Sequence, residues 1–172
     1  MKKTFSAVLA LLLLVVCLSS CQKEPVVLDL QAEANSILST YQLEGGNLYT
    51  SASTVLGEYL DEDLIRSYYG DLTSMPDFGS VESYVVYIDE SKPILPCEFG
   101  LFKMKEGADA QAFIAYLQAR IDLKIQNAKA YPSMDTSMLV TAKFVEKDGY
   151  VWYCAVKDAN DQINSALEAK FN

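Results

Sequence analysis

The chain has no histidine among its 172 residues, so it lacks the side chain on which many catalytic centres depend. Histidine supplies the base of Ser-His-Asp and Cys-His centres, many metal ligands and the usual proton shuttle at neutral pH. Beyond its first 20 residues the chain also has no serine three residues before a lysine and no glycine-rich phosphate loop. We therefore expect a protein that is not an enzyme, with no cofactor and no metal.

Two acidic motifs are the remaining candidates for carboxylate chemistry. Asp61-Glu62-Asp63 offers the oxygen ligands that calcium prefers, but it lacks the spaced ligands and the glycine of a calcium loop. We interpret it as the start of a helix, where acids cap the first turn and oppose the dipole. Asp135-Thr136-Ser137 resembles the Asp-Thr-Gly/Ser loop of aspartic proteases, which need two carboxylates sharing one proton. Nothing else in the chain resembles such an enzyme, so we interpret these residues as a turn.

Cys97 and Cys154 are the two cysteines that remain if the first 21 residues serve export and anchoring. An even pair in an exported domain is compatible with a disulfide, and closing this loop would contribute about 4 kcal/mol on the chain-entropy model. Both residues also lie in strand-like runs, where a free cysteine behaves as a small buried hydrophobe. The sequence leaves both possibilities open.

The N-terminus has the pattern of an export signal that ends at a cysteine. Lys2 and Lys3 precede an apolar run from Phe5 to Leu18, which is too short to span about 30 Å of hydrocarbon as a helix. The residues that follow, Leu18-Ser19-Ser20-Cys21, resemble the lipobox of bacterial lipoproteins. This resemblance implies cleavage before Cys21, lipidation of its thiol and attachment of the protein to the outside of a membrane. Two or more acyl chains hold a protein firmly at the bilayer.

Removal of residues 1–20 would leave 152 residues, a normal size for one domain. The removed segment holds two lysines and no acid, so 12 basic residues would face 23 acidic ones, for a net charge of −11. Phosphate backbones repel such a surface, and we expect no nucleic-acid partner. We predict three segments: a signal peptide over residues 1–20, a lipidated tether over 21–28 and one domain over 29–172.

The spacing of apolar residues predicts an α+β domain. The expected helices cover 30–43, a short 55–60, 64–69 after its cap at Asp61, about 22 residues from Ala110 to just before Pro132, and a C-terminal helix capped by Asp158. The expected strands cover 81–88, 95–104, 138–146 and 150–157, with loops over 47–54 and 71–79. We expect a four-stranded antiparallel sheet made of two ββα units, with both long helices on one face and a helical N-terminal portion.

Asp148-Gly149 predicts a type I′ turn between the last two strands, and this turn determines their register. It pairs Lys147 with Tyr150, and the alternation of side chains then sorts the hairpin into two faces. One face, predicted to be the core, has Val140, Ala142, Phe144, Val151, Tyr153 and Ala155. The other has Thr141, Lys143, Val145, Tyr150, Trp152 and Cys154. Lys143, Tyr150 and Trp152 could form an aromatic binding surface, or helices could cover this face and bury the rings.

Four blocks of sequence carry a second resemblance. They are residues 60–70, 97–103, 120–132 and 148–151, and they look like a family of small bacterial lipoproteins that carry a domain of unknown function. This family implies an uncharacterised extracytoplasmic domain and assigns no catalytic residue.

The sequence thus favours a lipid-anchored domain at the cell envelope, on the cell membrane or the outer membrane, that binds a protein or a small ligand without catalysis. One alternative is a carboxylate-based hydrolase of envelope glycans, which needs two acids facing each other across a cleft. Another is the ligand receptor of a transport system, although such receptors usually close two lobes around the ligand.

Overall fold

A computed structural model of the chain describes residues 26–70, 78–91 and 95–172. The predicted signal peptide, Cys21 and the first part of the predicted tether lie outside these residues, as does most of the predicted loop over 71–79. Within the described residues, no helix is long and apolar enough to cross a membrane.

An antiparallel sheet of five strands forms the centre of the described fold, in the order β1-β2-β3-β5-β4. The strands are β1 (Asn47–Thr50), β2 (Val81–Ile88), β3 (Glu98–Met104), β4 (Lys143–Lys147) and β5 (Tyr150–Ala155). The α+β class and the antiparallel sheet are as predicted, but the predicted count of four strands is wrong, because residues 47–50, which the sequence pattern assigns to a loop, form β1.

β1 is a strand because of its neighbours. Its four residues show no clear alternation, yet they pair with residues 85–88 of β2, and Tyr49 is buried. Pairing with an adjacent strand thus overrides a weak local preference. The chain then passes through turns, so the short helix predicted over residues 55–60 is not formed.

The C-terminal hairpin has the predicted register. Asp148 and Gly149 have φ angles of 52° and 80°, as a type I′ turn requires, and Lys147 pairs with Tyr150. β4 begins only at Lys143, because residues 137–140 form the short helix α5 (Ser137–Val140). Val140 is therefore exposed and does not belong to the core face on which it was predicted.

Among the described residues, four longer helices lie against the sheet: α2 (Leu30–Thr40), α3 (Glu62–Tyr69), α4 (Ala110–Ala128) and α6 (Asn160–Glu168), the last continued by the 3₁₀ turn η2 (Ala169–Phe171). The side chains of Asp29, Asp61 and Asp109 accept hydrogen bonds from backbone N–H groups of the first turns of α2, α3 and α4. Asp158 does not cap α6, which begins after Ala159.

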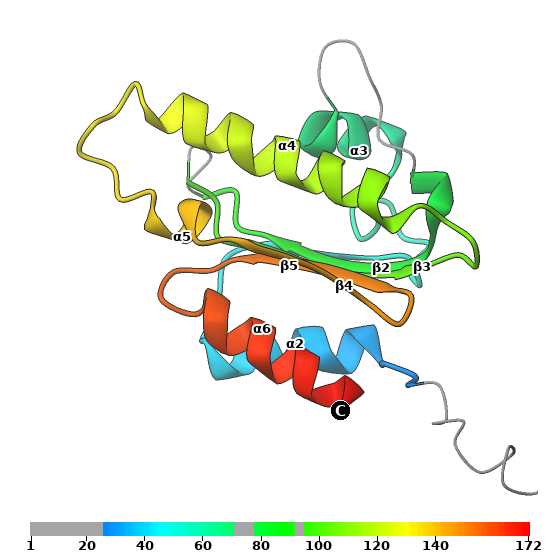
Figure 1. Ribbon diagram of the computed structural model, residues 1–172. Helices are drawn as coiled ribbons and strands as arrows, with labels where there is room; N and C mark the ends of the chain where they lie inside the picture. The colour runs from blue at the N-terminus through cyan, green and yellow to red at the C-terminus, as the bar shows by residue number, and fades with distance from the viewer. Residues whose placement is uncertain (1–25, 71–77, 92–94) are drawn as a thin grey trace, which may run out of the picture.

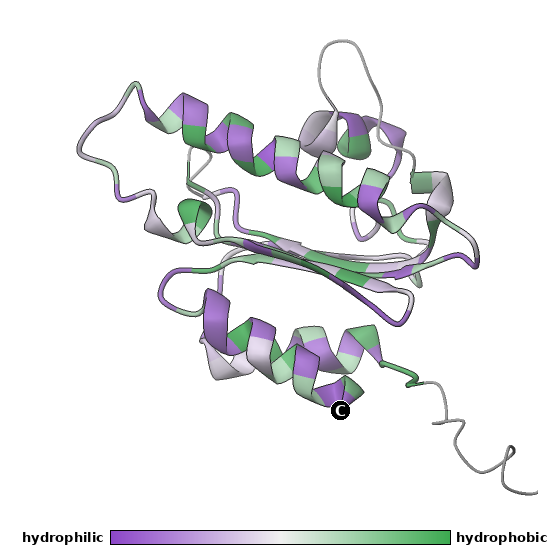
Figure 2. Ribbon diagram, viewed as in Figure 1, coloured by the Kyte–Doolittle hydropathy of each residue, from purple (hydrophilic) through white to green (hydrophobic). Residues whose placement is uncertain are grey.

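Helices cover both faces of the sheet, with α3, α4 and α5 on one face and α2 and α6 on the other (Figure 1). Hydrophobic and hydrophilic residues alternate along these helices (Figure 2), and their buried apolar residues belong to the two clusters that pack on the faces of the sheet. The prediction that both long helices share one face was wrong, because all six residues of β5 are buried. A strand that is apolar on both sides needs a cover on each side.

Candidate functional site

The predicted aromatic binding surface is buried inside the protein. Tyr150 and Trp152 are 3% and 1% exposed beneath the layer formed by α2, α6 and η2. The Trp152 ring stacks on Phe171 with 5.7 Å between ring centroids, and its Nε1–H donates to Asn164 Oδ1 at 3.1 Å. Lys143 is half-exposed and pairs with Asp161 at 3.4 Å. Burial was therefore the correct alternative, and these residues form no open platform.

Cys97 and Cys154 are not joined by a disulfide. The register pairs Cys154 with Phe99, and Cys97 lies two residues before Phe99, just ahead of β3, so it is a diagonal neighbour of Cys154. Diagonal neighbours have Cα atoms roughly 7–8 Å apart, whereas bridged cysteines have Cα atoms usually about 4.4–6.8 Å apart. Burial raises the pKa of the Cys154 thiol to about 12, so this side chain is an inert part of the core.

The acidic motifs have local structural roles. The Asp61 carboxylate caps α3, with Leu64 N–H donating to it at 2.8 Å. Asp135 Oδ1 accepts from the Ser137 N–H at 3.0 Å, and hydrogen bonds from the Ser137 side chain and backbone lower the pKa of Asp135. Over residues 26–70, 78–91 and 95–172, no group of three or more potential metal ligands comes together.

The strongest electrostatic feature is a buried ion pair between β3 and α4. Arg120 Nε and Nη2 donate to the two oxygens of Glu98 at 2.7 and 2.6 Å, a bidentate pair in which both side chains are at most 3% exposed. Arg120 Nη1 also donates to the backbone carbonyl of Tyr68 at 2.6 Å. Burial is the largest single cause and lowers the pKa of Arg120, but the charge of Glu98 and its hydrogen bonds to Arg120 together with the nearby tyrosines raise the pKa above its ordinary value, so the guanidinium stays charged.

Tyrosine rings enclose this ion pair. Tyr153 donates its hydroxyl proton to Glu98 Oε1 at 3.2 Å, and the Tyr69 hydroxyl lies 3.1 Å from that of Tyr153. The Arg120 guanidinium lies 5.3 Å from the ring centroids of both Tyr68 and Tyr69. Burial raises the pKa of Tyr69 and of Tyr153, so both hydroxyls stay protonated and available as donors. The cluster fixes α3 and α4 against the sheet.

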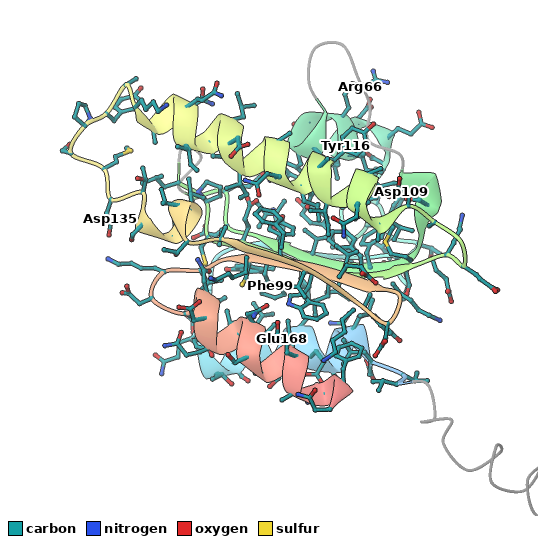
Figure 3. All side chains as sticks on the ribbon, viewed as in Figure 1. Arg66, Phe99, Asp109, Tyr116, Asp135 and Glu168 are labelled. Carbon is teal, nitrogen blue, oxygen red and sulfur yellow. The ribbon has the colours of Figure 1, made fainter. Side chains whose placement is uncertain are left out.

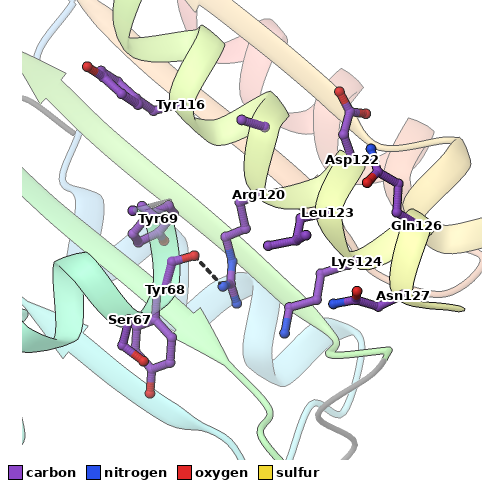
Figure 4. Close-up of a pocket in the computed structure, with 12 residues that line it drawn as sticks. Ser67, Tyr68, Tyr69, Tyr116, Arg120, Asp122, Leu123, Lys124, Gln126 and Asn127 are labelled. Carbon is purple, nitrogen blue, oxygen red and sulfur yellow. Dashed lines mark hydrogen bonds between the residues drawn. The ribbon is translucent and has the colours of Figure 1, made fainter. Parts of the chain in front are cut away.

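A pocket of about 530 Å³ opens above this cluster, between α3 and α4 (Figure 4). The α3 side contributes residues 67–70, and the α4 side contributes Tyr116, Ala119, Arg120, Asp122, Leu123, Lys124, Gln126 and Asn127. Tyr116, Arg120 and Lys124 are four residues apart and share one side of α4. Figure 3 shows Tyr116 on α4, the helix that lies above the sheet.

Two cations line one side of the pocket. The Lys124 side chain extends beside Arg120, whereas the Asp122 carboxylate points away from Arg120 (Figure 4). Burial, followed by the charge of Arg120, lowers the pKa of Lys124. An anion placed against Lys124 and Arg120 would counter both effects. Its charge would offset the repulsion between the two cations, and its contacts would replace the water that burial removes from Lys124.

Sequence reasoning missed this site, although two signals pointed to it. Glu98 is a lone acid in the apolar run 95–104, and Arg120 directly precedes Ile121 of the apolar stripe of α4. Charged residues in such positions are rarely buried unless they are paired. The charges of Glu98 and Arg120 are opposite, but the sequence does not show that the two side chains are in contact.

Comparisons of the chain with protein-family models, with curated proteins and with solved structures find no match. Function is therefore inferred from the geometry of the site and from the chemistry of its residues.

Proposed function

We propose that this protein is a lipid-anchored, extracytoplasmic binding module without catalytic activity, and that its ligand is a small organic anion held in the pocket between α3 and α4. The observation that carries the proposal is the placement of Arg120 and Lys124 on one side of this pocket. The chain as a whole carries a net charge of −9, so two cations side by side at the pocket, with Arg120 buried and Lys124 partly buried, are a local exception that favours an anion.

The size and lining of the pocket support a small ligand. Its volume lies in the usual range of ligand sites, about 300–1,000 Å³. Tyr116 and Leu123 supply apolar and aromatic surface, and Lys124 supplies a charge-assisted donor. A carboxylate attached to an aromatic or aliphatic body matches this combination.

Binding is the better proposal than glycan hydrolysis because of how the carboxylates are arranged. A hydrolase of this kind needs two acids on either side of the reacting bond. Among the described residues that line the pocket, Asp122 is the carboxylate. Glu98 lies below the pocket, but both oxygens of its carboxylate accept hydrogen bonds from Arg120.

The binding proposal is tested by NMR titration with three probes: benzoate, octanoate and inorganic phosphate. We expect saturable shifts of the Tyr116, Leu123 and Lys124 amides with a carboxylate. Lys124→Met should weaken this binding at least about tenfold, since a hydrogen bond to a charged group contributes about 1.5–3 kcal/mol. Lys129→Met removes the same charge outside the pocket and is the matched control. If no probe saturates, or if both variants weaken binding equally, the proposal is wrong.

The anchoring proposal rests on Leu18-Ser19-Ser20-Cys21 and is tested by intact mass. Protein extracted from host membranes should begin at Cys21 and carry a diacylglyceryl group, and Cys21→Ser should keep its leader and lack the lipid. An unmodified thiol at Cys21 would show that the protein is not attached to the membrane through a lipid on this residue.

A further inference from the structure

The first described residues, 26–28, contact the domain next to the start of β5. Val26 and Leu28 pack against the core beneath the sheet, and the Leu28 N–H donates to the Tyr150 hydroxyl at 3.0 Å. The predicted tether over residues 21–28 is therefore too long at its C-terminal end, because Val26 and Leu28 belong to the folded domain. Five peptide steps separate Cys21 from Val26, which allows a reach of at most about 18 Å.

The strand register shows which parts of the fold share this end. Tyr150 is the first residue of β5 and pairs with Lys103, near the end of β3, while Val81 at the start of β2 pairs with Met104. Thr50, the last residue of β1, pairs with Val85 in the middle of β2, and the Ser51 N–H then donates to the Tyr84 carbonyl, so the chain leaves β1 in the direction of Val81. We call this side the proximal end. It has the loop 51–59, the loop 105–109 and the turn at Asp148-Gly149, and it lies at the right of Figure 1.

The proximal end presents exposed aliphatic side chains. Val27 is 85% exposed, and in the loop after β1 Val55 and Leu56 are 56% and 77% exposed. β1 and β5 are separated by three strand spacings, which is about 14 Å across the sheet. Leu123, Tyr131, Met134 and Val140 are also exposed, but they belong to the C-terminal half of α4 and the segment that follows it.

Charges at this end are mixed rather than strongly basic. Lys103 pairs with Glu82 at 2.8 Å, and Lys147 Nζ donates to Asn172 Oδ1 at 3.3 Å. Glu106 and Asp148 lie in the adjoining loop and turn. Such a surface does not favour anionic lipid, whereas it is compatible with zwitterionic headgroups.

We propose that the proximal end rests on a zwitterionic lipid surface, with Val55 and Leu56 in contact with the headgroup region. This inference rests on the proposed anchor at Cys21. The strands and α4 then run away from the bilayer, because α4 starts at the proximal end and rises about 1.5 Å per residue. Arg120 is ten residues beyond Ala110, so the pocket lies about 15 Å further out and is open to the surrounding solution.

The orientation is tested with the lipidated full-length protein in phosphatidylcholine vesicles. An environment-sensitive fluorophore is attached through L56C or through M134C, each in a Cys97→Ser background, and the vesicles contain headgroup-level or acyl-level nitroxide lipids. Leu56 and Met134 are both exposed, so neither substitution disturbs the core. The Cys97→Ser protein without an added cysteine controls for labelling at Cys154.

We expect a blue shift and a loss of fluorescence with headgroup-level nitroxide for the L56C label, and neither change for the M134C label. Equal quenching at the two positions, or quenching only of the M134C label, would overturn the orientation while the anchor stands. Protein that does not float with the vesicles would overturn the anchor and this inference together. Flotation and fluorescence thus separate the two failures.

Discussion

At the scale of single residues, Arg120 and Glu98 determine how α4 sits on the sheet. Each has lost almost all contact with water, and the two bidentate hydrogen bonds replace that solvation. Removing one partner of a buried pair leaves an uncompensated charge, which costs more than the pair itself contributes. The pair therefore matters less for net stability than for the specific arrangement of α3, α4 and β3.

Arg120→Met should destabilise the domain by about 3–5 kcal/mol, because Glu98 would remain buried without its counter-charge. The double variant Glu98→Leu with Arg120→Met should recover a large part of this loss. Urea denaturation, followed by the fluorescence of Trp152, measures both. If the double variant is as unstable as the sum of the two single variants, the two side chains are not coupled as described.

At the scale of elements, β3 can lie in the middle of the sheet because Gly100 leaves room for two aromatic rings. A Cβ at this position would lie 2.6 Å from atoms of both Phe102 and Tyr153. Both rings are buried, and they stack on each other with 6.4 Å between centroids. The small residue is thus required by the packing of β3 against β5, not by its backbone angles.

Gly100→Ala should cost about 1–3 kcal/mol, since an added methyl group in a well-packed core forces neighbouring rings to move. Phe102→Leu on the same background removes one of the obstructing rings, so the two substitutions together should cost less than the sum of their separate effects. Denaturation midpoints of the three variants measure this coupling. Strict additivity would contradict the close contact at Gly100.

At the scale of the whole molecule, both sheet faces are rich in buried or half-buried tyrosines. Burial is the largest cause that raises the pKa of Tyr68, Tyr69, Tyr84, Tyr87 and Tyr153. In the unfolded chain the same hydroxyls lose their protons near pH 10. The folded state therefore holds more protons than the unfolded state above this pH.

Stability should consequently be unaffected by these groups below about pH 10 and should fall as the pH rises further toward the folded-state pKa values. Each fully buried tyrosine, such as Tyr69, contributes a slope of at most about 1.4 kcal/mol per pH unit. Tyr69→Phe should reduce the slope, whereas Tyr131→Phe, at an exposed position, should leave it unchanged. Urea midpoints measured between pH 8 and 11 test this, and a midpoint that does not fall would contradict it.

Local signals in the sequence determined much of the secondary structure. Asp29 and Asp61 marked helix starts, Asp148-Gly149 determined the register of the last hairpin, and the apolar stripe located α4. These features depend on neighbours a few residues apart, so they can be read from the chain. The lipidation of Cys21 stays a prediction, because it lies outside the described residues.

Only the tertiary structure decided which helix covers which face, that β1 joins the sheet, and that Trp152 is buried. It alone brought Glu98 and Arg120, 22 residues apart in the chain, into one ion pair beneath the pocket. The physical reason is that burial and charge pairing depend on contacts between distant segments. The sequence pattern shows which residues need a partner, but only the packing of the elements decides which partner they find.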